Sequence, residues 1–258
     1  MPGIGLFPLT LFEERTMTVE VFIPCFIDQL YPQTAFNTIK LLEKSGCEVL
    51  YNAQQTCCGQ PAYNAGFWDE AKQVGSKFLQ DFSEEHYIVS PSASCTGMIK
   101  HGYNQLFTNT VTHNTCRAIQ RNIYELSDFL VNVLKKDYFG AEMEGRAVYH
   151  DSCSGLRECH IRSEPRQLLE KVDGLELIEM RDTDMCCGFG GTFAVKFESI
   201  STAMTEQKIN NALEVGADYI ISTDASCLLQ LQAYIDHKKL NIKTRHLADV
   251  LTHGWANI

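Results

Sequence analysis

The tripeptide Cys57-Cys58-Gly59 recurs in the second half of the chain as Cys186-Cys187-Gly188. One distant cysteine precedes each tripeptide and another follows it, namely Cys25 and Cys95 in the first half and Cys153 and Cys227 in the second. The upstream gaps are 32 and 33 residues, and the downstream gaps are 37 and 40. A period of roughly 130 residues is too long for a solenoid repeat, so the pattern indicates a duplicated domain.

Each of these cysteines follows a predicted β-strand. Segments rich in β-branched and apolar residues predict strands over 19–23, 48–51 and 87–89, and again over 147–149, 175–178 and 219–222. Helical periodicity predicts helices over 33–44, 68–82, 165–172, 199–215 and 228–237. Strands that alternate with helices form parallel sheets, whose carboxyl ends share one ligand-binding edge. We therefore expect three loops to bring the four sulfurs of each half together.

A polar stretch marks the boundary between the two repeats. The stretch around residues 142–146, with Gly140 and Gly145, is the expected boundary between a first domain at 17–140 and a second at 145–258. The predicted fold is therefore α/β, with two tandem, pseudo-symmetric Rossmann-like domains built on parallel sheets. Residues 1–16 precede the first strand, and we expect them to form a tail.

Composition excludes several classes of function. The 258 residues include 22 Lys+Arg and 32 Asp+Glu, which gives a net charge of −10, and no basic run offers a nucleic acid a binding surface. No stretch approaches the roughly 20 apolar residues of a membrane span. The N-terminus lacks the basic flank of a secretory signal. The cysteine count of 11 is odd, so reduced cysteines in the cytoplasm are favoured over structural disulfides.

Four thiolates in each half match the ligand count of an iron–sulfur cluster and also of a closed zinc site. Adjacent cysteines point in opposite directions from an extended segment, which suits a cluster several ångströms across better than one small ion. Gly59 and Gly188 allow the backbone to turn tightly against such a group. The predicted ligands are Cys25, Cys57, Cys58 and Cys95, and then Cys153, Cys186, Cys187 and Cys227.

The repeated pattern resembles the cysteine-rich CCG domain of heterodisulfide reductase and related Fe–S oxidoreductases. Three longer sequence motifs resemble those of the lactate-utilisation protein A family. They are Thr56-Cys57-Cys58-Gly59-Gln60-Pro61-Ala62-Tyr63-Asn64, Tyr149-His150-Asp151-Ser152-Cys153 and Cys186-Cys187-Gly188-Phe189-Gly190-Gly191-Thr192-Phe193. The resemblance implies a cytoplasmic component of an oxidoreductase that binds one or two [4Fe–4S] clusters. It also implies two companions, a ferredoxin-like Fe–S protein and a third subunit, with which the chain oxidises L-lactate to pyruvate.

The sequence departs from the family in two places. The fullest family pattern ends each half in Cys-x-x-Cys, but the first cysteine of that pair is replaced here by Ser92 and by Asp224. Either oxygen is a candidate labile ligand or has no contact with the metal. Ser154 stands where a histidine is usual after the cysteine.

The remaining candidate residues have less specific surroundings. Cys47 begins a predicted strand and is expected to pack in the core, as a free cysteine behaves as a small hydrophobe. Cys116 and Cys159 have no counterpart in the other half and are interpreted as incidental, although Cys159 is also a candidate spare ligand or resolving thiol. His150 either tunes the nearby metal group or is a hydrogen-bonded strand residue. The glycines at 188–191 do not have the spacing of a phosphate-binding loop.

Three functional hypotheses follow. The first is an electron-transfer subunit of a lactate-oxidising complex. The second is a thiol/disulfide redox catalyst like heterodisulfide reductase, which the loss of the fifth cysteine disfavours. The third is a non-redox scaffold that holds zinc.

Overall fold

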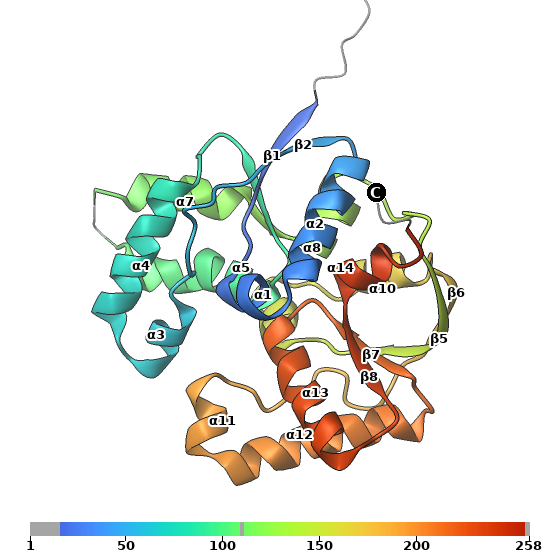
Figure 1. Ribbon diagram of the computed structural model, residues 1–258. Helices are drawn as coiled ribbons and strands as arrows, with labels where there is room; N and C mark the ends of the chain where they lie inside the picture. The colour runs from blue at the N-terminus through green and yellow to red at the C-terminus, as the bar shows by residue number, and fades with distance from the viewer. Residues whose placement is uncertain (1–15, 109–110, 256–258) are drawn as a thin grey trace, which may run out of the picture.

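The computed structural model describes residues 16–108 and 111–255, so the expected N-terminal tail lies outside the described residues except for Thr16. The described chain contains two four-stranded sheets in which all neighbouring strands are parallel (Figure 1). The first has the order β2-β1-β3-β4, with β1 at Met17–Val21, β2 at Cys47–Leu50, β3 at Tyr87–Ser90 and β4 at Ile123–Glu125. The second has the order β6-β5-β7-β8, with β5 at Glu142–Tyr149, β6 at Asp173–Leu177, β7 at Tyr219–Ser222 and β8 at Lys243–His246.

The two sheets are equivalent residue by residue. Val19 pairs with Tyr87 in the first sheet as Ala147 pairs with Tyr219 in the second. Three residues beyond these positions, the N–H of Phe22 donates to the carbonyl of Val89 (2.9 Å), and the N–H of His150 donates to the carbonyl of Ile221 (2.8 Å). The predicted α/β fold with duplicated parallel sheets is therefore confirmed.

Helices connect the strands, as right-handed parallel connections require. In the first half they are α1 (Cys25–Leu30), α2 (Pro32–Lys44), α3 (Gln60–Ala65), α4 (Trp68–Asp81), α5 (Ala93–Gly97), π-helical η1 (Met98–Gly102), α6 (Tyr103–Leu106), α7 (His113–Asn122), α8 (Leu126–Asp128) and π-helical η2 (Phe129–Val133). In the second half they are α9 (Cys153–Arg157), α10 (Glu164–Leu169), α11 (Thr192–Lys196), α12 (Glu198–Glu214), α13 (Ala225–Lys238) and α14 (Leu247–Leu251).

Most predicted elements lie within a few residues of the observed ones. The helix predicted over 33–44 is α2, the one over 68–82 is α4, and the one over 199–215 is α12. The short edge strands β4 and β8 were not predicted. The polar stretch at 142–146 is the first part of β5, with an irregular register between Glu142 and Gly145. The domain division at 17–140 and 145–258 stays a prediction.

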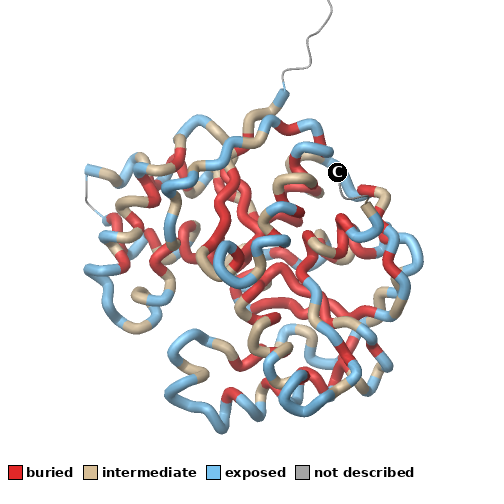
Figure 2. The backbone as a smooth tube through the Cα atoms, in the orientation of Figure 1, coloured by how far each residue is buried: buried red, intermediate tan, exposed pale blue. Residues whose placement is uncertain are grey.

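One hydrophobic core joins the two sheets. It contains Val21 and Leu41 from the first half together with Tyr149 and Leu247 from the second. Helix α2 contacts α14, and α8 contacts α10, so each half supplies one helix to each pair. Figure 2 shows the buried backbone concentrated at the centre, where the sheets meet. Two further cores, one within each half, flank this shared core.

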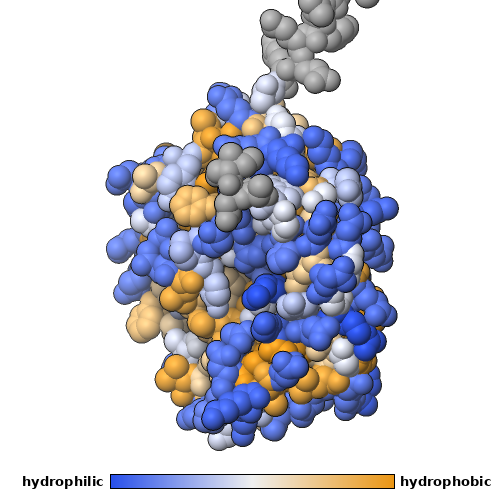
Figure 3. All heavy atoms as spheres, turned by 45° about the vertical axis from the view of Figure 1, so that its right-hand side comes forward, coloured by the Kyte–Doolittle hydropathy of each residue, from blue (hydrophilic) through white to orange (hydrophobic). Residues whose placement is uncertain are grey.

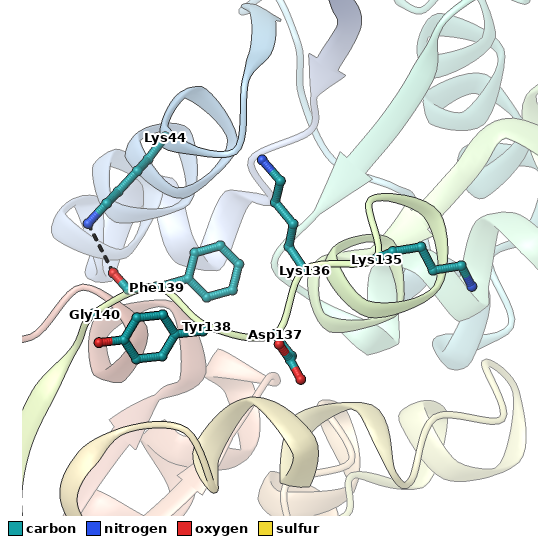
Figure 4. Close-up of a pocket in the computed structure, with 7 residues that line it drawn as sticks. All are labelled: Lys44, Lys135, Lys136, Asp137, Tyr138, Phe139 and Gly140. Atoms are coloured by element: carbon teal, nitrogen blue, oxygen red, sulfur yellow. Dashed lines mark hydrogen bonds between the residues drawn. The ribbon is translucent and has the colours of Figure 1, made fainter.

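The segment between η2 and β5 is fastened to the first half by lysine side chains. The Nζ of Lys44 donates to the carbonyl of Phe139 (2.9 Å) and lies 3.7 Å from the centre of the Trp255 ring. The Nζ of Lys136 donates to the carbonyl of Ser45 (2.7 Å). Figure 4 shows these lysines around the surface hollow that residues 135–140 line. Because the ammonium groups of Lys44 and Lys136 already bind backbone carbonyls, we interpret their role at this hollow as structural: they hold the connecting segment against the first half.

The outer surface is mostly hydrophilic on the face shown in Figure 3, with apolar side chains gathered towards its lower part, where the second half lies. Among the helices of the described residues, none combines the length and the apolar character needed to cross a bilayer.

Candidate metal centre

The first sulfur set consists of Cys25, Cys57, Cys58 and Cys95, which come from three segments of the first half. Cys25 is the first residue of α1, the adjacent pair lies between β2 and α3, and Cys95 lies in α5. The Sγ atoms of Cys25 and Cys57 are 3.8 Å apart, and those of Cys58 and Cys95 are 3.2 Å apart. The loops after β1, β2 and β3 therefore bring these four sulfurs together at the carboxyl edge of the sheet, as predicted.

The second sulfur set consists of Cys153, Cys186, Cys187 and Cys227, and it repeats this arrangement. Cys153 begins α9, and Cys227 lies in the first turn of α13. The Sγ atoms of Cys187 and Cys227 are 3.0 Å apart, and the thiol of Cys153 is hydrogen-bonded to Cys186. In both sets the second cysteine of the tripeptide and the downstream cysteine are buried, while the other two are more accessible. All eight cysteines are free thiols.

The glycine of each tripeptide holds the backbone against the sulfurs. Gly59 and Gly188 have φ values of +85° and +92°, which L side chains rarely adopt. This turn lets the N–H of Gly59 donate to the Sγ of Cys57 and the N–H of Gly188 donate to the Sγ of Cys186, each at 3.4 Å. Such hydrogen bonds stabilise a thiolate and tune the electronic properties of a metal that it binds.

The thiols within each set share their protons. Hydrogen bonds from Cys25 and then Cys58 lower the pKa of Cys57 to about 3, and those from Cys153 and Cys187 lower that of Cys186 to about 2. The same contacts raise the pKa values of the donor thiols Cys25 and Cys153. Because four thiolates this close repel one another, full deprotonation requires a cation among them. Three features fit a thiolate-bound metal group: the sulfur donors are free thiols, backbone N–H groups point at two of them, and the sulfurs of each set lie close together.

Both sulfur sets open into one cavity of about 560 Å³ between the two halves. All eight cysteines line it, together with residues of α3 and α11. Helix α1, which begins at Cys25, contacts α13, which carries Cys227, and α5, which carries Cys95, contacts α9, which begins at Cys153. The ring of Phe26 also packs edge-to-face on that of Phe189, with centroids 5.7 Å apart. The cavity is therefore assembled from both repeats.

Ser92 and Asp224, the two candidate oxygen ligands, make different contacts. Ser92 caps α5, since its Oγ accepts a hydrogen bond from the N–H of Cys95 (3.4 Å). The carboxylate of Asp224 accepts hydrogen bonds from the N–H (3.0 Å) and the Oγ (2.7 Å) of Ser94 in the first half. Both residues line the cavity, and Asp224 links the two halves.

The other cysteines lie away from the cavity lining. Cys47 is buried in the shared core, which confirms the predicted packing role. Cys116 is buried in α7. The Sγ of Cys159 donates to the carbonyl of Ala93 in the first half (3.5 Å), so this residue joins the repeats.

Two polar residues, His150 and Lys208, lie behind the second sulfur set. His150 is fully buried, and one of its ring nitrogens lies within 4.8 Å of the Sγ atoms of Cys187 and Cys227, which also lie within that distance of each other. Lys208, for which no role was predicted, is fully buried in α12, where its Nζ donates to the carbonyls of Asp182 (2.6 Å) and Thr183 (3.0 Å). A sequence signal for His150 appears when the two halves are aligned on Cys25 and Cys153. In that alignment the position of His150 holds an apolar residue, Phe22, in the first half.

These features define a class of duplicated cysteine-rich α/β proteins. Residues 19–100 and 147–232 each match the cysteine-rich domain family, CCG. The chain belongs to the lactate utilization protein A family. It is 43% identical over 238 residues to lactate utilization protein A from Halalkalibacterium halodurans, covering 92% of this chain and 97% of that protein. It is 41% identical over 236 residues to the protein of the same name from Geobacillus sp. (strain WCH70), covering 91% and 99%.

Solved structures show a likeness of fold alone. A hypothetical protein from Helicobacter pylori matches with a TM-score of 0.55 at 11% sequence identity. The match covers 93% of this chain and 49% of that longer chain.

Proposed function

We propose that this chain is the iron–sulfur subunit of a cytoplasmic L-lactate-oxidising complex, in which it transfers the electrons released when lactate becomes pyruvate. The observation that carries the proposal is the presence of eight reduced cysteines, in two matching sets, around one cavity. The names of the relatives support the lactate pathway, and the sulfur donors support one or two [4Fe–4S] clusters as the cofactor.

The chain's own residues have defined tasks in this proposal. The first sulfur set and the second sulfur set supply four thiolates each, and the N–H groups of Gly59 and Gly188 stabilise one thiolate in each set. When bound, the clusters supply one-electron transfer. The contact between Asp224 and Ser94 holds the two sets in a fixed relation.

Partner subunits are part of the proposal, namely a ferredoxin-like Fe–S protein and a third lactate-utilisation subunit. Large apolar side chains are exposed at two equivalent corners, where Phe67 precedes α4 and Phe197 precedes α12. Val195 on α11 is exposed and also lines the cavity. Exposed apolar groups at an opening to a redox site favour contact with another protein.

One observation favours zinc as a second candidate. The ligand atoms of His150, Cys187 and Cys227 all lie within 4.8 Å of one another, close enough to surround a single ion. Such a site is redox-inactive, and the chain is then a scaffold.

The test is iron, zinc and acid-labile sulfide analysis of protein purified without oxygen. Iron and sulfide near eight per chain support two clusters, and near four support one. Zinc without sulfide rules out the proposed function. Lactate-dependent dye reduction, assayed with and without the partner subunits, then separates a carrier from a catalyst, because activity of the isolated chain contradicts a pure carrier role.

A further inference from the structure

We propose that His150 is a nitrogen ligand of the metal group held by the second sulfur set. The first sulfur set is then an all-thiolate site and the second a mixed thiolate and imidazole site. This inference rests on the metal-binding part of the proposed function.

The position of His150 in the fold carries the argument. The residue follows β5 directly and is fully buried, and within the described part of the chain neither ring nitrogen has a hydrogen-bond partner. A buried polar group without a partner is costly, so such groups in native proteins point to an unseen ligand. One nitrogen lies within 4.8 Å of the sulfurs of Cys187 and Cys227. Imidazole nitrogen and thiolate are a common ligand combination for iron and zinc.

The first half provides an internal control. Phe22 occupies the position of His150, as its backbone hydrogen bond to β3 shows, and it is also fully buried. Its ring packs edge-to-face on Phe78 and Phe82, with centroids 4.9 and 5.6 Å apart. Hydrocarbon therefore fills this position well in one repeat. Packing alone therefore does not explain why the same position in the other repeat holds an imidazole.

With His150 included, the second sulfur set offers five donor side chains where the first offers four. If the imidazole binds in place of one of these thiolates, the reduction potential of the second site would be higher than that of an all-thiolate site, and the second site would be the electron acceptor of the pair.

The test is pulsed EPR of the reduced, metal-loaded full chain, with histidine labelled with ¹⁵N. We expect a strong coupling from a directly bound nitrogen that changes on labelling. His150→Phe, which copies the first half, loses this coupling. His150→Cys supplies a thiolate instead, so it keeps the metal, loses the coupling and shifts the potential of one site downwards. His246→Gln is the control, because His246 is buried but bonded to the carbonyl of Pro91, and this variant keeps the coupling.

The opposite results overturn the inference. These are a loaded wild-type protein without the coupling, only the weak coupling of a hydrogen-bonded nitrogen, or a coupling that persists in His150→Cys. Metal analysis of the same samples separates this failure from failure of the proposed function. If zinc is found without sulfide, the proposed function fails, and His150 is tested in the same way after cobalt(II) has replaced the zinc. Protein that binds no metal refutes both.

Discussion

The two halves share one backbone and one sulfur arrangement, yet they differ in what lies behind the sulfurs. In the first half Phe22 and Phe78 form an aromatic cluster with Phe82. In the second half His150 takes the place of Phe22. Lys208 on α12 corresponds to Phe78 on α4, because each lies eleven residues after the phenylalanine that precedes its helix, Phe197 and Phe67 respectively. Strand ends and sulfurs are thus common to both sites, while the residues behind the sulfurs are where the two repeats differ.

A second difference lies at the outer edge of each sheet. Glu125 ends β4 and caps α8, since its carboxylate accepts hydrogen bonds from the N–H groups of Ser127 and Asp128. His246 ends β8 and caps α14 through the N–H of Ala248 (3.1 Å). The same capping task is therefore done by an acid in one repeat and by a base in the other.

The largest expected effect comes from removing one buried sulfur. Cys187→Ser should abolish the metal group of the second half and leave that of the first, and Cys58→Ser should do the reverse, because a hydroxyl is a poor substitute for a thiolate ligand. Metal and sulfide analysis with EPR spectra of both variants checks this. Cys116→Ser is the matched control and keeps both groups. Full metal content in Cys187→Ser contradicts the two-site scheme.

The aromatic cluster should matter more for stability than its polar counterpart. Phe78→Ala removes a fully buried ring and should lower the free energy of unfolding by about 3–5 kcal/mol. Lys208→Met keeps most of the buried volume but leaves two carbonyls unpaired, with an expected loss of about 1–3 kcal/mol. Urea denaturation of both variants measures the difference. Equal losses of unfolding free energy in the two variants contradict the expected difference between the aromatic cluster and its polar counterpart.

The turns at the two tripeptides should tolerate a methyl group unequally. A Cβ at Gly188 lies 2.4 Å from the carbonyl oxygen of Ser201, whereas one at Gly59 lies 3.0 Å from that of Ala71. Since α12 must move, Gly188→Ala should cost about 2–4 kcal/mol of unfolding free energy, and Gly59→Ala about 1–3 kcal/mol. Gly66→Ala is the control, because it has a similar φ but no atom within 4 Å. Its cost, read from the same denaturation curves, should be the smallest.

The smallest expected effect is the pH dependence that Glu125 of the first half adds to stability. Burial raises the pKa of Glu125 from 4.5 to about 8, so the folded state favours the protonated form. The stability from this group is therefore complete below pH 4.5 and is lost as the pH rises through 8. Relative to wild type, Glu125→Gln should gain about 1–3 kcal/mol on going from pH 5 to pH 8. An unchanged difference across this range, in denaturation at each pH, argues against a buried neutral carboxyl.

Apolar runs and helical periodicity in the sequence predicted most of the strands and the longer helices. The apolar runs of β1, β3 and β7 and the periodicity of α2 and α4 identify those elements, and the positions of the cysteines after strands predict two sulfur sets. Strand β4 was missed because it is only three residues long, and β8 because its four residues, Lys243–His246, are all polar. Such segments become strands by pairing with a neighbour, which no local pattern records.

Contacts between the repeats could not be predicted either. The sequence leaves Asp224 a candidate metal ligand, but its partner Ser94 lies 130 residues away, and only the packing of the two halves brings them together. The contact of Phe26 with Phe189 has the same origin. Histidine at position 150 was noticed, but its lack of a hydrogen-bond partner is a property of the folded chain.

The common cavity has a kinetic consequence. Both sulfur sets line one cavity, so oxygen or a chelator that enters it has access to both sites. Damage to the two sites should thus be correlated in time, and molecules that have lost one metal group should be rare among partly inactivated protein. For the same reason, a single partner seated over the opening shields both sites at once.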